Sequence, residues 1–135
     1  MGTTTMGFAN RTGLLRTVLR LDGAGTGLFG VFLLAAASAL ADPLGLPLGW
    51  SIPFGIAMLI GAAVLLLIAG QPEIPGRLAF PVVAVNAGSA VAMIALVCIR
   101  PMPLTGWGIA FMLSGAVFVA IFAELEYLAV RRAAH

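Results

Sequence analysis

The sequence predicts an all-α membrane protein built as a bundle of four transmembrane helices. Of its 135 residues, 61% are hydrophobic and only 9% are charged, which leaves too little polar surface for a water-soluble globule. Uncharged stretches cover residues 23–41, 43–72, 78–99 and 101–123, and each can hold the roughly 20 apolar residues that cross a lipid core as a helix. We expect one domain, residues 1–135, with spans at about 22–41, 52–70, 78–99 and 104–130.

The basic residues predict the orientation of these spans. All seven are arginines, and six lie before the first span, between the second and third, or after the fourth, whereas only Arg100 lies on the other side. Because basic residues accumulate on the cytoplasmic side, both termini and the loop 71–77 should face the cytoplasm. The lack of lysine beside abundant Ala, Gly and Arg is typical of a high-GC bacterial genome, so we expect the bacterial cytoplasmic (inner) membrane. The net charge of +2 then reflects topology, and no nucleic-acid partner is expected.

The first span has an alternative interpretation as a cleaved signal peptide, because Ala39-Leu40-Ala41 resembles an A-x-A cleavage site. Its apolar run of 19 residues is longer than the usual signal segment, which favours a retained helix. Residues 11–21 carry leucine and valine at helical spacing, so we expect them to extend this first helix toward the headgroups.

A repeated motif indicates that the chain is a duplicated helical hairpin. Residues 49–54 and 106–111 both read G-W-x-I-x-F, and Arg20-Leu21 recurs as Arg77-Leu78 at the same offset of 57. Two hairpins in the same orientation would be related by an axis along the membrane normal. The alternative is chance resemblance among the Trp, Pro and Gly residues that are common at membrane interfaces.

Residues 25–30 read G-x-G-x-x-G, which matches a dinucleotide-binding fingerprint. That fingerprint requires a preceding strand and a βαβ unit, whereas these glycines lie inside an apolar helix. Small residues four apart instead allow a neighbouring helix to approach closely. We therefore predict helix packing, with no cofactor, through these positions and similar rows elsewhere: Gly23, Gly27, Gly30, Gly88, Ala116 and Ala120.

Polar residues within the spans are the candidate functional residues, because they are costly in lipid. The predicted intramembrane cluster consists of Arg20, Asp22, Asn86, Glu124, Glu126 and Tyr127. Glu124 continues the row of Ala116 and Ala120, so it is the expected interior carboxylate. It could serve as a proton or ion relay, or form a structural bridge to Arg20. Asn86 near mid-membrane could bind a substrate or ion, or donate a hydrogen bond to the next helix.

Motifs for conventional catalysis are missing from the sequence. The only histidine is the terminal His135, and the only cysteine, Cys98, lies in an apolar stretch. A histidine-based metal site, a bis-histidine haem site and a Ser-His or Cys-His pair within the bundle are therefore excluded. We expect no catalytic residues, no bound metal and no enzymatic activity.

Several short motifs stand out along the chain: residues 19–22 (LRLD), 44–47 (LGLP), 85–86 (VN) and 123–127 (AELEY) with Arg131-Arg132. Together they resemble a loose group of small bacterial four-helix membrane proteins that carries no known activity. The resemblance implies the four-span arrangement and a shared polar set of Asp22, Asn86 and Glu124.

Two functions remain open at this point. The first is a non-enzymatic accessory or helix-packing subunit, acting as a homo-oligomer or within a larger membrane complex. The second is a small proton- or ion-coupled transporter that uses Asp22, Asn86 and Glu124.

Overall fold

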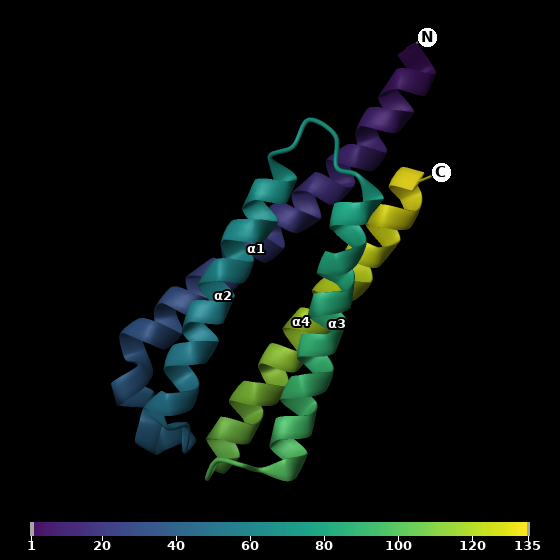
Figure 1. Ribbon diagram of the computed structural model, residues 1–135. Coiled ribbons are helices and arrows are strands. Elements are labelled where there is room, and N and C mark those ends of the chain that lie inside the picture. The colour runs from purple at the N-terminus through teal and green to yellow at the C-terminus, as the bar shows by residue number, and fades with distance from the viewer. Residues whose placement is uncertain (1, 135) are drawn as a thin grey trace.

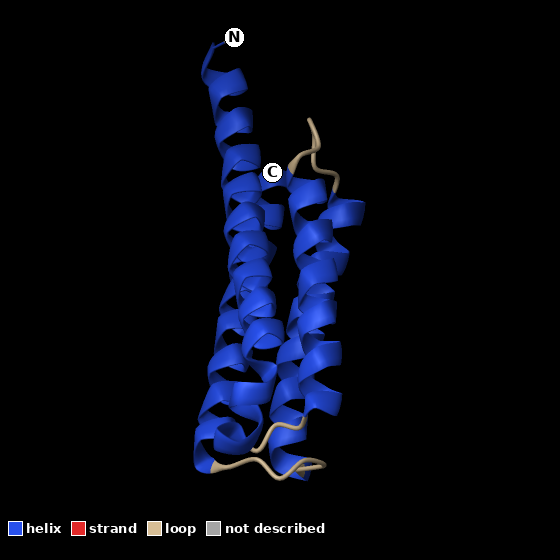
Figure 2. Cartoon of the chain, turned by 90° about the vertical axis from the view of Figure 1, so that its left-hand side faces the viewer, coloured by secondary structure: helices blue, strands red, loops and turns tan. Residues whose placement is uncertain are grey.

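The computed structural model describes residues 2–134, and the side chains of residues 13–132. It consists of four helices, α1 (Gly2–Leu44), α2 (Leu48–Ala69), α3 (Gly76–Ile99) and α4 (Gly106–Ala134), with no strand in residues 2–134. Figures 1 and 2 show the helices side by side with short loops at both ends. The all-α prediction is confirmed. His135 and the side chain of Arg11 lie outside the described residues.

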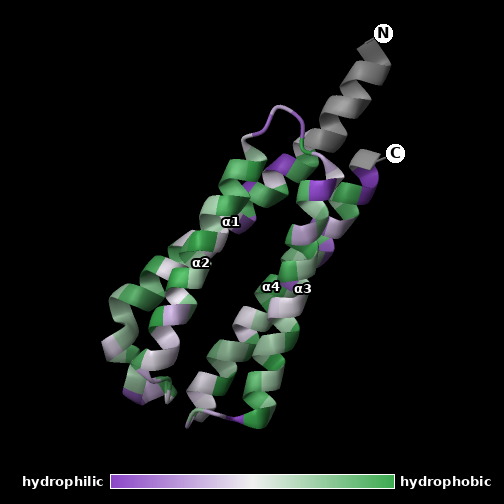
Figure 3. Cartoon of the chain, in the orientation of Figure 1, coloured by the Kyte–Doolittle hydropathy of each residue, from purple (hydrophilic) through white to green (hydrophobic). Residues whose placement is uncertain are grey.

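All four helices are long and apolar enough to cross a membrane: residues Gly13–Leu44, Leu48–Ala69, Gly76–Ile99 and Gly106–Arg132. The last three agree with the predicted spans to within a few residues. The helix of the first span continues through Arg16 and Arg20, before the predicted start of the span at residue 22, as the helical spacing of residues 11–21 led us to expect. Figure 3 shows hydrophobic colour along most of each helix. Large apolar side chains point outward, among them Leu28 with 73% of its surface exposed, as expected of helices that face lipid. The protein is therefore a multi-pass membrane protein.

The helices form two antiparallel hairpins. The pairs α1–α2 and α3–α4 each pack along their length, and α1 also packs on α4, whereas α2 barely touches α3. Both termini lie at one end of the molecule in Figure 1. We call this the arginine end, because Arg16, Arg77 and Arg131 lie there. The opposite end, formed by residues 42–51 and 100–108, is the tryptophan end.

Glycines on one face of α1 bring α2 close. A Cβ atom added at Gly30 would lie 3.2 Å from the Gly55 carbonyl oxygen, and one added at Gly27 would lie 3.3 Å from Ala62 Cβ. Burying apolar surface drives association little in lipid, so close backbone approach is what stabilises such a pair. Gly23, Gly27 and Gly30, three of the positions predicted to pack, thus lie against α2.

The tryptophan end is closed by backbone contacts between the two hairpins. α1 ends at Leu44, and the φ of +65° at the following Gly45 allows the Leu46 amide to donate to the Ala41 carbonyl oxygen at 3.0 Å. The Thr105 amide donates to Leu44 O at 3.1 Å, and its hydroxyl donates to Pro43 O at 2.7 Å. Glycine is needed on both sides of this junction, because a Cβ at Gly45 would meet Pro103 O and a Cβ at Gly108 would meet Leu44 O. The loop 100–105 is therefore fixed against the end of α1.

Candidate functional site

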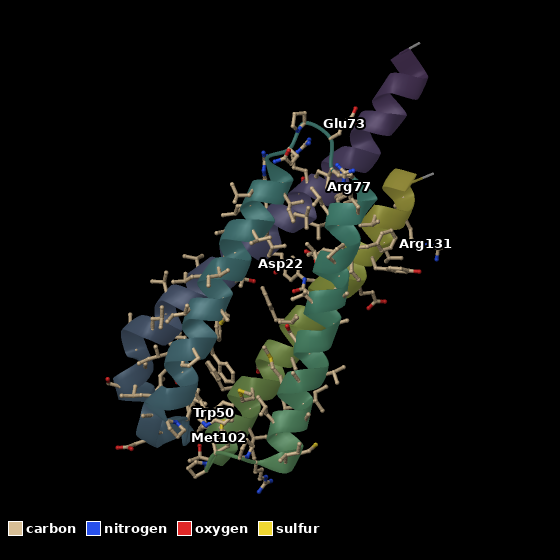
Figure 4. The ribbon with its side chains drawn as sticks, in the orientation of Figure 1. Asp22, Trp50, Glu73, Arg77, Met102 and Arg131 are labelled. Carbon is tan, nitrogen blue, oxygen red and sulfur yellow. The ribbon has the colours of Figure 1, made fainter. Side chains whose placement is uncertain are left out.

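Four polar side chains meet inside the bundle, between α1, α3 and α4. They are Asp22 and Thr26 from α1, Asn86 from α3 and Glu126 from α4, and we call them the polar layer. Asp22 points from α1 toward the α3–α4 pair in Figure 4. Asn86 lies ten residues after the first residue of α3, about 15 Å along that helix. The layer is therefore well inside the candidate spans.

Asn86 joins the two carboxylates. Its side-chain nitrogen Nδ2 donates to Asp22 Oδ2 at 2.9 Å and to Glu126 Oε1 at 2.5 Å. The Thr26 hydroxyl donates to the other Asp22 oxygen, Oδ1, at 3.0 Å. One amide group from α3 thus links α1 to α4, and both acids accept hydrogen bonds from neutral donors.

Both acids are buried, but their hydrogen bonding differs. Asp22 is 3% exposed and Glu126 is 0% exposed. Both oxygens of Asp22 accept a hydrogen bond, whereas Glu126 Oε2 is buried and has no hydrogen-bond partner. An unpartnered buried carboxylate oxygen is costly, because it has lost its hydration without replacement.

Helical periodicity places these side chains on the inner faces. Asp22 and Thr26 are four residues apart, so they lie on the same face of α1. On α4 the buried row runs through Ala116, Ala123, Glu126 and Val130, with steps of seven, three and four residues. Glu126 therefore occupies a position that an apolar residue would otherwise take.

Apolar side chains enclose the polar layer. Toward the arginine end lies a buried cluster that includes Leu15, Leu19, Ala129 and Val130. Toward the tryptophan end, the Phe118 ring lies beside Gly25, where an added Cβ would approach it to 2.9 Å. Apolar side chains thus flank the acids on both sides along the bundle.

None of the described arginine side chains forms an ion pair with the two buried acids. Arg16 instead binds the end of α2, where its Nε donates to Ala69 O at 2.8 Å and its Nη2 donates to Gln71 O at 2.7 Å. Ala69 is the last residue of α2, and its carbonyl oxygen has no partner within the helix, so Arg16 caps α2. Arg20 is exposed. The polar layer therefore contains no basic side chain.

The structure separates the members of the predicted polar cluster. Asp22, Asn86 and Glu126 come together, whereas Arg20 and Glu124 are exposed. The expectation that Glu124 is the interior carboxylate is wrong, because its position faces outward while Glu126 faces the core. Tyr127 is also exposed, at 41%, and lies against the Arg131 guanidinium, 5.7 Å from the ring centre.

The predicted packing positions on α3 and α4 have mixed outcomes. Ala116 is buried. Gly88 and Ala120 are exposed, and nothing lies within 4 Å of a Cβ added at Gly88. Their expected packing role within this chain is therefore wrong. Sequence reasoning missed two further glycines that another part of the chain approaches closely, Gly55 and Gly108. A signal was available near Gly108, because the Thr105-Gly106 pair before α4 is typical of a helix N-cap, and Gly108 N donates to Thr105 Oγ1 at 3.1 Å.

The described residues contain no group of three or more His, Cys, Asp or Glu side chains that could hold a metal ion. Comparison of the chain with protein-family models, with curated proteins and with solved structures finds no match. The arrangement can bind positive charge, since it offers two carboxylates and no cationic side chain.

Proposed function

We propose that the protein is a small membrane carrier in which Asp22, Asn86 and Glu126 form an intramembrane site that binds and releases a cation. The observation that supports this proposal is that two buried carboxylates share the neutral amide of Asn86 as a hydrogen-bond donor and have no basic partner among the described side chains. Intramembrane acids of this kind are found mainly on ion and proton pathways.

Energetic magnitudes favour a functional role over a structural one. A charged side chain at the bilayer centre costs at least about 2.5 kcal/mol on insertion scales. An interhelical hydrogen bond in a membrane returns on average about 0.6 kcal/mol. The two hydrogen bonds of Asn86 therefore do not offset the burial of the acids, and neutral side chains would join the helices at lower cost.

The alternative is the accessory or helix-packing subunit, in which the polar layer only holds helices together. It predicts that neutral substitutes serve as well as the acids. A carrier of four helices should act as an oligomer, because so few helices rarely enclose a path alone. Both hypotheses thus allow a homo-oligomer, and oligomeric state does not distinguish them.

Charge movement in proteoliposomes distinguishes the two hypotheses. Purified protein on a solid-supported membrane is exposed to jumps in pH, Na⁺, K⁺ or Mg²⁺, and the capacitive current is recorded. We expect a current with at least one cation, its loss in Glu126→Gln, and its retention in Glu124→Gln. The control variant makes the same chemical change two residues away, at an exposed position. If wild type gives no current with any cation, or Glu126→Gln retains the current, the carrier is rejected in favour of the packing subunit.

We further propose that the arginine end faces the cytoplasm of a bacterial inner membrane, so that both termini are cytoplasmic. The support is that Arg77 and Arg131 lie at the end where both termini lie (Figure 4), and that Arg16 binds the loop after α2 at the same end. A cysteine introduced at Glu73, in the exposed loop of this end, should react with a membrane-impermeant maleimide only in opened cells. Labelling in intact spheroplasts would reverse the orientation.

The duplicated hairpin remains our proposal for the origin of the fold. Its support is that the two G-W-x-I-x-F copies lie at the beginning of α2 and of α4. The two halves have diverged, because α1 packs on α4 whereas the corresponding pair, α3 and α2, barely meets.

A further inference from the structure

The oxygen atoms of the polar layer limit which cation it can hold. The two acids supply four carboxylate oxygens. Asp22 Oδ1 accepts from Thr26, and Asp22 Oδ2 and Glu126 Oε1 both accept from Asn86. Glu126 Oε2 is the one carboxylate oxygen of the layer that has no partner. A cation therefore finds a single free oxygen.

The orientation of Asn86 argues against a metal ion between the acids. A metal ion bridging them would occupy the place where Asn86 Nδ2 donates to both carboxylates. An amino group carries positive hydrogen atoms toward its acceptors, so it repels a cation there. Hard cations such as Mg²⁺ and Ca²⁺ also require about six or more oxygen ligands. One carboxylate oxygen does not meet that need, whereas a proton requires only one.

We propose that the bound cation is a proton, carried by Glu126 on Oε2, and that Asp22 is the neighbouring acid whose two oxygens are already held by hydrogen-bond donors. This inference rests on the proposed function and narrows it to one ion. Binding forms an O–H bond at Glu126 and release breaks it, so the layer gains one positive charge on binding and loses it on release. Thr26 and Asn86 are positioning residues, because their donors satisfy Asp22 and leave the proton to Glu126.

The charged groups on the surrounding helices agree with this assignment. On α1, Asp22 is the charged group that lies nearest to Glu126. Two other charged side chains of α1 point elsewhere, because Arg16 binds the end of α2 and Arg20 is exposed. Residues Leu48–Ala69 of α2 contain no titratable side chain. The titratable side chains of α3 are Arg77 and Cys98, which lie near its two ends. On α4 the other titratable side chains in the described part are exposed: Glu124, Tyr127, Arg131 and Arg132. A proton is then the positive charge that offsets Asp22 and Glu126.

Infrared difference spectroscopy of the full-length protein in nanodiscs tests the assignment. A protonated carboxyl group in an apolar site has a distinct C=O stretch. We expect one such band per chain, appearing as pH falls, absent from Glu126→Gln and retained in Glu124→Gln. Addition of Na⁺ or Mg²⁺ at fixed pH should leave it unchanged. Two results would overturn the proposal. If the band is retained in Glu126→Gln but lost in Asp22→Asn, the two acids have the opposite roles. If Na⁺ or Mg²⁺ removes the band, the polar layer is a metal site.

A second measurement on the wild-type chain avoids dependence on the folding of a variant. Dicyclohexylcarbodiimide reacts with protonated carboxyl groups in apolar surroundings, and mass spectrometry locates the adduct. The proposal requires an adduct on Glu126, and an adduct on Asp22 alone contradicts it. The proposed function can fail separately. A carboxyl band without any charge movement rejects the carrier alone, whereas currents driven by Na⁺ or Mg²⁺ but not by protons reject the proton and keep the carrier.

Discussion

The tryptophan end and the polar layer both join the first hairpin to the second, but they do so with different groups. At the tryptophan end the contact is made by backbone, with Thr105 N donating to Leu44 O and glycines where the chains touch. In the polar layer it is made by side chains, with Asn86 between Asp22 and Glu126. A backbone junction has one geometry, whereas side chains can exchange partners by rotating about their own bonds. The fold therefore combines a fixed junction with an adjustable one.

This difference suggests a division of roles within the bundle. At the tryptophan end the two hairpins are held together by backbone hydrogen bonds. At the arginine end they are connected by the loop between α2 and α3, and the contact between them is made by apolar side chains such as Leu19 and Ala129. The polar layer, between these two ends, is the part of the contact in which side chains can exchange partners.

The largest effect is expected when the fixed junction is overfilled. A Cβ atom in Gly108→Ala would collide with Leu44 O, so α4 must move away from α1. We expect the free energy of unfolding to fall by about 3 kcal/mol, the upper part of the range for overpacking. SDS titration of the protein in mixed micelles measures this. The matched control is Gly106→Ala, where nothing lies within 4 Å of the new atom. Equal stability of the two variants would show that the junction is not fixed.

Removal of the amide from the adjustable junction should have the next largest effect. Asn86→Leu deletes both hydrogen bonds between the helices and leaves the two acids facing a hydrocarbon side chain. We expect a loss of about 2 kcal/mol in the same titration, because two buried carboxylate oxygens lose their donor, together with loss of charge movement. Ala87→Leu adds similar bulk at an exposed neighbouring position and should change neither quantity. A fully stable, active Asn86→Leu protein would mean that the amide does not join the helices.

Thr105→Val tests the hydrogen bonds at the tryptophan end. The variant loses the donor to Pro43 O and the cap that accepts from Gly108 N. We expect a loss of about 1 kcal/mol in unfolding free energy, as for other N-caps. Thr105→Ser keeps the hydroxyl and should restore most of that loss. Failure of serine to do so would assign the effect to the methyl group instead.

The smallest effect on stability is expected for Thr26→Val, which removes a hydrogen bond within α1. The loss should be about 0.6 kcal/mol or less. Because Asp22 loses a donor, we expect the pH dependence of the charge movement to change while the current itself persists. Thr26→Ser should behave like wild type. An inactive Thr26→Val protein would make Thr26 part of the pathway rather than a positioning residue.

Composition and hydropathy were enough to predict the coarse fold, because a chain in lipid must satisfy its backbone polar groups within helices. An even number of spans then returned the C-terminus to the starting end. The spacing of Gly23, Gly27 and Gly30 predicted close packing for α1, although it could not name α2 as the neighbour. Backbone contacts such as that between Gly108 and Leu44 depend on tertiary geometry, which no local pattern contains.

The error at Glu124 has a geometrical cause. Sequence reasoning extended the row of Ala116 and Ala120 by steps of four residues. In a helix with 3.6 residues per turn, a residue four positions on lies about 40° further around the helix axis. After two such steps from Ala116, Glu124 therefore lies away from the buried face. Alternating steps of three and four follow the face instead, and lead through Ala123 to Glu126. Applied to the sequence, the seven-residue spacing of Ala116, Ala123 and Val130 would have favoured the correct acid.

The most direct test of the central claim compares Glu126→Gln with Glu124→Gln in two quantities at once, cation-dependent charge movement and resistance to unfolding. Glutamine at position 126 can still accept a hydrogen bond from Asn86 but cannot carry the exchangeable charge. If the polar layer is a cation site, Glu126→Gln loses the current while its stability stays equal to or rises above that of wild type, and Glu124→Gln changes neither. If Glu126→Gln is less stable and its current equals that of wild type, the two buried acids only hold the helices together and the account is wrong.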